Sequence, residues 1–273
     1  MTVARTNSSI DAPITATNLE NGLKQAMQDA GFGTHFAEYT VSSKKRIVWK
    51  TTYNNAQYGN AFTEAILASS SGSFYLSFTL YWFFNASNNT GSAEPLTTGT
   101  MTLNTSTSIN FVSLNGNNQF RMVLIIQGTK VGAMSLVRPA HRPAWWTDNA
   151  YPYFFMSFYT ATQLSQLQVR EWRGTGASSL HPFGTNIYIL RPIRLNGLLP
   201  NNKRQVVASV QLQTAPGTNQ GLIGQFDADI VHAAMSGASP LDMIVVSPGT
   251  EEYLILDPGD PTYNIGGFAV RIT

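Results

Sequence analysis

The sequence predicts a mainly β fold, with antiparallel sheets packed as a β-sandwich or jelly-roll-like structure and one N-terminal α-helix. The stretch from Phe74 to Phe84 places a large apolar residue at every even position, which is the period of two of a pleated strand. Many other short apolar segments are separated by Ser, Asn, Gly or Pro-Gly turns, with no helical pattern between them. Antiparallel sheets are therefore favoured over βαβ units.

The segment from Phe74 to Phe84 is expected to be a central strand. At the rise of a strand it spans roughly 36 Å, and its even positions commit one face to a core. The odd positions include Tyr75 and Tyr81, so the second face is amphipathic. We expect this second face to contact another layer or a partner chain.

One helix is expected after a polar arm that ends at Pro13. Thr17 and Glu20 fit the spacing of a capping box, and Gly31 stands where a left-handed C-cap belongs. The apolar residues between them recur at helical spacing on one stripe; they are Leu19, Leu23, Ala26, Met27 and Ala30. This stripe is expected to dock on a sheet edge.

The rest of the first half is predicted to be a meander of strands. The expected strands are 36–41, 46–53, 61–68, 101–103, 109–114, 119–127 and 132–137. Asn115-Gly116 is a hairpin signal, and Asn85 to Gly99 is expected to be a polar loop. The basic run Lys44 to Arg46 is interpreted as a solvated hairpin turn.

The amino-acid composition changes from Arg138 to Tyr153, where prolines and aromatic residues are frequent and β-branched residues are few. We therefore predict an N-terminal module, 1–137, and a C-terminal β module, 138–273, with one continuous domain as the alternative. A short helix is expected at 162–171. Strands are expected at 154–159, 187–190, 206–212, 225–231, 243–247, 253–256 and 268–272.

The amino-acid composition argues against several classes of function. Only 12% of the residues are charged and the formal net charge is +2, which is too small for an electrostatic footprint on nucleic acid. No cysteine is present, so disulfides and thiolate chemistry are excluded. Without an apolar leader or a long apolar run, neither export nor a membrane span is expected. A polar, weakly charged surface favours contacts with other subunits.

No motif in the sequence specifies a reaction. There is no Gly-x-Ser-x-Gly elbow, and the four histidines do not have the spacing of metal ligands. No cofactor, metal site or catalytic residue is predicted, and Asp227 with Asp229 is interpreted as an exposed strand face. A pair of glycosidase carboxylates stays open, because such pairs form from distant strands. The candidates are Glu38, Glu64, Glu94, Glu171, Glu251 and Glu252.

The strongest candidate binding residues are Arg142, Trp145 and Trp146. Adjacent tryptophans beside an arginine in a Pro-rich stretch are suited to anchor a protein interface or to stack on a sugar ring. An interface or packing role is favoured over carbohydrate binding, because large rigid aromatic side chains serve burial first.

Two parts of the chain resemble a known family. The C-terminal segments start at Gly224, Ser239, Glu252 and Gly267, and the opening part combines 16–32 with 46–49. They are similar to virion structural proteins of tailed bacteriophages, of neck, tail, baseplate or fibre type. The middle, 85–221, has no counterpart. The resemblance implies a particle component that is made in the host cytoplasm and localised in the virion.

The expected function is therefore a non-enzymatic structural subunit of a tailed-phage virion. Its partners would be other virion proteins and copies of itself, in a ring or trimer, since symmetric homo-oligomers dominate. Neither nucleic acid nor membrane is an expected partner. The first alternative is a carbohydrate-binding module that recognises a host surface glycan through Trp145 and Trp146. The second alternative is a polysaccharide depolymerase.

Overall fold

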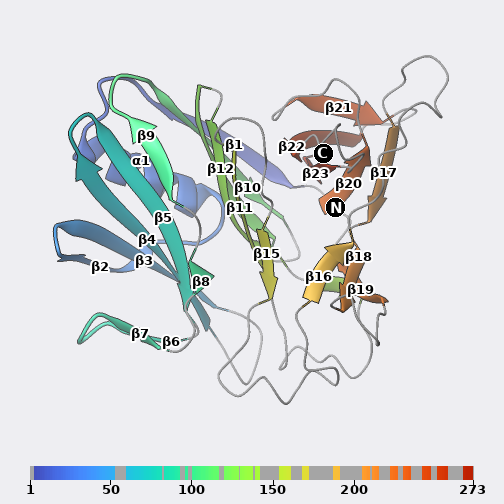
Figure 1. The fold of residues 1–273 in the computed structure, drawn as a ribbon, viewed down its shortest axis with the longest axis horizontal. Coiled ribbons are helices and arrows are strands. Elements are labelled where there is room, and N and C mark those ends of the chain that lie inside the picture. The colour runs from blue at the N-terminus through green and yellow to red at the C-terminus, as the bar shows by residue number, and fades with distance from the viewer. Residues whose placement is uncertain are drawn as a thin grey trace.

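The fold is mainly β, with antiparallel sheets and, among the described residues, one helix, in line with the sequence prediction (Figure 1). The description comes from a computed structural model. The residues that it describes are 3–52, 60–81, 83–92, 96–97, 100–116, 120–128, 130–137, 139–141, 154–160, 168–171, 187–190, 205–209, 211–214, 222–226, 230–234, 242–246, 251–257 and 267–272.

Sheet I contains strands from both halves of the chain. In spatial order, its strands are β1 (Ala4–Ile10), β10 (Ile109–Asn115), β11 (Arg121–Gln127), β12 (Lys130–Val137), β14 (Phe154–Thr160) and β15 (Gln168–Glu171). The hairpin predicted at Asn115-Gly116 joins β10 to β11, and the Gly116 amide donates to the carbonyl of Phe120. Strand β12 pairs with β14, which follows the boundary proposed at residue 138. The division into two modules stays a prediction.

Sheet II is the meander expected from the first half of the chain. Its strands are β2 (His35–Val41), β3 (Lys44–Thr52), β4 (Asn60–Ser70) and β5 (Ser73–Tyr81), with β8 (Leu96–Thr97) and β9 (Met101–Asn104) both paired to β5. Both strands β4 and β5 are long, and they pair along the whole length of β5. Strand β2 forms one edge of this sheet.

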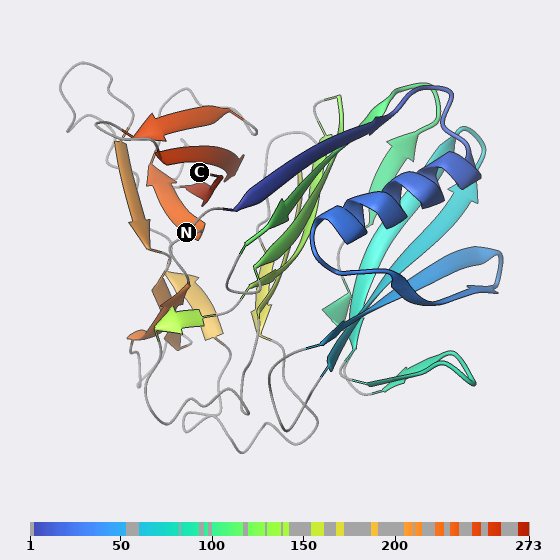
Figure 2. The same cartoon turned by 180° about the vertical axis from the view of Figure 1, so that it is seen from behind.

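Helix α1 (Ala16–Asp29) lies in the opening between sheets I and II (Figure 2). It packs against β1 and β10. The Ser113 hydroxyl of β10 donates to the carbonyl of Ala26 over 2.8 Å, which ties the helix to sheet I. The predicted stripe is confirmed, since Leu19, Leu23 and Met27 are all buried with Ala26.

The ends of the helix follow sequence rules, but the start lies two residues before the predicted one. Thr15, not Thr17, is the N-cap: its hydroxyl accepts from the Asn18 amide, and the Asn18 side chain accepts from the Thr15 amide. Starting at Thr15 brings Ile14 and Leu19 into the same core cluster, as in a hydrophobic staple. At the other end Gly31 has the expected positive φ of 84°, and amides after Ala30 satisfy the last carbonyls.

The main core lies between the two sheets and α1. Its largest fully buried side chains include Trp49, Phe111, Leu19 and Leu23. The predicted alternation is confirmed within β5, where Phe74, Leu76, Phe78 and Leu80 all belong to this core.

The aromatic strand ends earlier than predicted. Strand β5 stops at Tyr81, and Phe84 belongs to a short hairpin of β6 (Phe83–Asn85) and β7 (Thr90–Ser92). Phe84 is buried, but in a second cluster outside the main core. The segment 85–99, expected to be a polar loop, therefore contains part of this hairpin and strand β8. Polar residues such as Asn are compatible with the tight turn of a hairpin, so a polar segment can still contain paired strands.

Two other expectations are corrected. The polar arm before Pro13 contains strand β1, an edge strand whose residues are mostly exposed; its sequence therefore lacks apolar alternation. Residues 168–171 of the predicted helix at 162–171 form strand β15, where pairing with β14 prevails over an imperfect helical spacing.

Two smaller sheets contain the remaining strands. One is formed by β13 (Pro139–His141), β19 (Leu222–Phe226), β18 (Gln211–Thr214) and β16 (Ile187–Leu190). The other is formed by β17 (Gln205–Ser209), β20 (Ile230–Ala234), β23 (Gly267–Arg271), β22 (Glu251–Asp257) and β21 (Met243–Val246). The chain begins beside the second of these, since the Arg5 side chain contacts the sulfur of Met243 at 3.6 Å.

Candidate interaction surface on sheet II

Side chains alternate between two faces of sheet II, and each face has its own cluster. The inner face points toward α1 and contributes Ile47, Trp49 and Ala65 to the main core. The outer face contributes Val48 and Phe62, which belong with Phe84 to the second cluster. Strand pairing of Val48 with Glu64 and of Glu64 with Thr79 places Glu64 on the outer face.

Glu64 is a fully buried carboxylate with three hydrogen-bond donors. Its oxygens accept from the hydroxyl of Tyr39, from the hydroxyl of Tyr81 over 2.9 Å and from the Arg46 guanidinium over 2.9 Å. The donors come from β2, β5 and β3, so one side chain of β4 joins all four strands. A buried charge needs such pairing, because an uncompensated carboxylate is costly to remove from water.

Burial and the neighbouring carboxylate keep both tyrosines protonated. Burial is the largest cause of the raised pKa values of Tyr39 and Tyr81, and the hydrogen bond and negative charge of Glu64 add to it. The pKa of Tyr81 rises to about 12, and that of Tyr39 rises further. Both hydroxyls therefore remain donors to Glu64 near neutral pH.

The β6–β7 hairpin covers part of this outer face. The ring of Phe84 lies 6.0 Å from Tyr39, 6.2 Å from Phe62 and 6.1 Å from Tyr81, measured between centroids. On β7, Gly91 approaches Tyr81 so closely that a Cβ atom would lie 2.2 Å from the ring. The hairpin is thus held by ring packing at a position where only glycine fits.

Two aromatic side chains on this side of the sheet remain exposed. Phe36 on β2 is 44% exposed, with its ring 5.5 Å from Phe62 and the Lys50 ammonium 5.7 Å from its centroid. Phe83 on β6, next to Phe84, is 57% exposed. We call Phe36, Phe62, Phe83 and Phe84, with the Tyr39–Glu64–Tyr81 cluster, the aromatic face.

The chemistry available on the aromatic face is contact rather than catalysis. Glu64 is 0% exposed and already accepts from three donors, so a substrate has no route to its oxygens. The exposed groups are phenyl rings beside an edge strand. Large rigid aromatic side chains beside an arginine are the residues that carry binding energy in protein interfaces.

A second ionic cluster lies on the inner side of sheet II. Glu38 accepts from the ammonium of Lys24 over 2.6 Å and from that of Lys45, and His35 lies 3.4 Å away. The hydrogen bond from Lys24, followed by that from Lys45, lowers the pKa of Glu38 to about 2. Glu38 and Glu64 occupy opposite faces of the sheet, so these two candidate glutamates do not form a catalytic pair.

The basic run Lys44 to Arg46 is not the solvated turn that the sequence predicted. The turn is formed by Ser42 and Ser43, both with positive φ, and the basic residues begin strand β3. Lys45 and Arg46 then point to opposite faces, one toward Glu38 and the other toward Glu64. Strand β3 therefore starts earlier than predicted, because Lys45 and Arg46 each form an ion pair with a carboxylate on a neighbouring strand.

The binding residues predicted from sequence, Arg142, Trp145 and Trp146, lie outside the described residues. The Tyr39–Arg46–Glu64–Tyr81 cluster was not predicted from the sequence. The available signal was Glu64 itself, a charge in the middle of an apolar strand, which requires a partner. Within the described ranges no cluster of three metal-ligating side chains is found, and none of the helices there has the length and apolarity to span a membrane.

Comparison with known proteins assigns no family to the chain. No protein-family model matches the chain, and a search of curated proteins found no match.

Proposed function

We propose that this chain is a non-enzymatic structural subunit that works through contacts with other protein chains. Its main contact is with a second copy of itself through the aromatic face of sheet II. The single observation that carries this proposal is the exposure of Phe36 and Phe83 beside a buried carboxylate that is paired within the chain.

Burial of these rings is the physical reason for association. Removing apolar surface from water contributes about 25 cal/mol per Å², and aromatic side chains are enriched at the centres of interfaces. Glu64 adds no desolvation cost, because it is already buried and paired inside one copy. The net charge of +2 is also too small to oppose contact between identical chains.

Strand β2 adds a second reason for self-association. It forms an edge of sheet II and carries Phe36, so backbone groups on its open side lie next to an exposed ring. Unpaired edges pair readily with another chain unless they are blocked. Two copies meeting at this edge would bury the ring and satisfy the backbone groups together, in an isologous contact.

The identity of the assembly is a separate part of the proposal. Following the resemblance of its terminal regions, we propose the virion of a tailed bacteriophage as the assembly. Antibodies against this chain should label a defined part of particles produced from the genome that encodes it, as seen by immunogold electron microscopy. Particles that carry no label, with the chain left in the host lysate, would contradict the virion assignment and leave self-association untouched.

Light scattering coupled to size exclusion tests the self-association. Wild type should have a mass of at least two chains, and the double variant Phe36→Thr/Phe83→Thr should have the mass of one. Val245→Thr is the matched control, because Val245 is also an exposed apolar strand residue but belongs to the sheet of β21. A monomeric wild type, or a double variant that assembles as wild type does, would contradict the proposal.

A further inference from the structure

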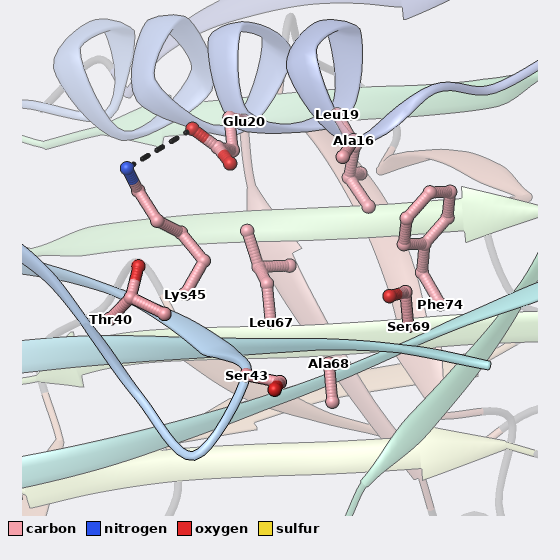
Figure 3. Close-up of a pocket in the computed structure, with 10 residues that line it drawn as sticks. All are labelled: Ala16, Leu19, Glu20, Thr40, Ser43, Lys45, Leu67, Ala68, Ser69 and Phe74. Atoms are coloured by element: carbon pink, nitrogen blue, oxygen red, sulfur yellow. Dashed lines mark ion pairs between the residues drawn. The ribbon is translucent and has the colours of Figure 1, made fainter.

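A pocket of about 320 Å³ lies beside helix α1 (Figure 3). It lies between the first turns of α1 and the inner face of sheet II, near the β2–β3 and β4–β5 turns. Helix α1 contributes Ala16, Leu19 and Glu20 to its lining. The size is at the lower end of the range for small-molecule sites.

The strand register explains why the sheet residues meet there. Lys45 pairs with Leu67 across β3 and β4, and Ser69 pairs with Phe74 across β4 and β5. Residues 67 and 69 lie two apart on one strand, so all four side chains share the inner face. Thr40 pairs with Lys45 and extends the same row onto β2.

The wall of the pocket has an apolar part and a polar part. Leu19, Leu67 and Phe74 form the apolar part and are almost fully buried. The polar part is formed by Thr40, Ser43, Ser69, Glu20 and Lys45. In the portion of the chain that the structure describes, the three hydroxyl groups make no hydrogen bond to another side chain, so they are available to a ligand.

The charges at the pocket compensate each other. The Lys45 ammonium contacts the carboxylate of Glu38 and lies 3.7 Å from that of Glu20, as the dashed line in Figure 3 marks. Glu38 also accepts from Lys24 over 2.6 Å, so two lysines compensate two glutamates. No net positive charge is left to hold an anion such as a phosphate, and no net negative charge is left to hold a cation. The pair still offers one acceptor and one donor group beside the hydroxyls.

We propose that this pocket binds a neutral, hydroxylated six-membered ring, the chemistry of a hexopyranose. Such a ring has an apolar C–H surface that suits Phe74 and Leu67, and a periphery of hydroxyls that suits Glu20, Lys45 and Ser69. Sugar of this kind could arrive free or as the terminal residue of a glycan. The inference goes beyond the proposed assembly and does not depend on it, because the pocket lies on the opposite side of sheet II from the aromatic face.

Saturation-transfer NMR with neutral methyl hexopyranosides is the test, run beside a sugar phosphate of the same ring size. We expect transfer to at least one neutral glycoside at a dissociation constant of about 1 mM or tighter, and none to the phosphate. A glycan array then distinguishes the sources: binding to terminal residues of the same sugar indicates a glycan, and its absence indicates the free sugar.

Four variants keep the test specific. Ser69→Leu fills the pocket and should weaken binding at least tenfold, whereas Ser70→Leu on the same strand points to the other face and should leave it unchanged. Glu20→Gln should weaken binding, while Asp29→Asn, the same chemical change at the far end of α1, should not. Absence of transfer to every neutral glycoside, preference for the sugar phosphate, or undiminished binding by a folded Ser69→Leu variant would overturn the proposal.

Discussion

The inner face of sheet II packs against α1 and sheet I. Among the described residues, its outer face packs against the small β6–β7 hairpin and leaves two aromatic rings exposed. Around Trp49 the inner face is mainly apolar, with the buried hydroxyls of Thr51 and Thr63 as its polar groups there. The outer face combines aromatic rings with a buried carboxylate. We therefore expect the inner face to contribute most to the stability of the fold, and the exposed rings of the outer face to be available for the proposed contact.

Glu38 and Glu64 of sheet II reverse this pattern, because the exposed carboxylate is on the inner face and the buried one is on the outer face. Glu38 stays partly exposed and is neutralised by two lysines, an arrangement that water and salt screen. Glu64 is buried and relies on Tyr39, Tyr81 and Arg46. We expect the first cluster to contribute little to stability and the second to be essential to the order of the outer face.

The largest effect should come from the inner face. Trp49→Ala removes the largest side chain of the core and should reduce the free energy of unfolding by about 3–5 kcal/mol, because a cavity remains between the sheets. Urea denaturation followed by circular dichroism measures this. Trp49→Phe should lose clearly less, and equal losses for the two variants would contradict a tightly packed inner face.

A slightly smaller loss is expected at the buried carboxylate. Glu64→Ala leaves two tyrosine hydroxyls and Arg46 without their acceptor and should cost about 3 kcal/mol. A double-mutant cycle with Arg46→Met measures the coupling between the pair, which should be favourable. If removal of Glu64 left the denaturation midpoint unchanged, the cluster would not hold the outer face together.

The hairpin provides a comparison between neighbouring residues. Phe84→Ala should reduce the free energy of unfolding by about 2 kcal/mol, less than for the inner core because a surface hairpin can partly close the gap. Phe83→Ala should change it by no more than about 0.5 kcal/mol, since that ring is exposed in a single chain. Both are measured on protein diluted to the monomer. Equal effects would mean that the hairpin does not pack through Phe84.

The smallest effect is expected at Glu38 and depends on pH. The folded state lowers its pKa from 4.5 to about 2, so its contribution is complete above pH 4.5 and is lost as pH falls toward 2. Because the group is partly exposed, the contribution at neutral pH should be about 0.5 kcal/mol. Glu38→Gln should therefore flatten the pH dependence of stability between pH 4.5 and 2. A slope identical to that of wild type would show that the lysine contacts have no effect on folding.

Much of the first half of the fold could be predicted from sequence. The alternation in 74–80 and the stripe of Leu19, Leu23 and Met27 both report directly which side is buried. Strand β1 and the shift of the N-cap to Thr15 were missed, because both depend on tertiary partners. Strand β1 exists through pairing with β10, and the helix start depends on bringing Ile14 into the core.

The candidate surface was less predictable than the fold. Tyr39, Glu64 and Tyr81 come from three strands, and only the register of sheet II brings them together. The residues predicted from sequence were Arg142, Trp145 and Trp146, because adjacent aromatic residues can be recognised in a sequence whereas a cross-strand cluster cannot.

Hydrogen exchange across the association equilibrium tests most directly whether the aromatic face joins two copies. Peptides that cover β2 and the β6–β7 hairpin should exchange more slowly in concentrated protein than in protein diluted to the monomer. Peptides that cover β11, which is enclosed within sheet I, should exchange alike in both. Protection confined to other strands, or no change in β2 and the hairpin on association, would contradict the account.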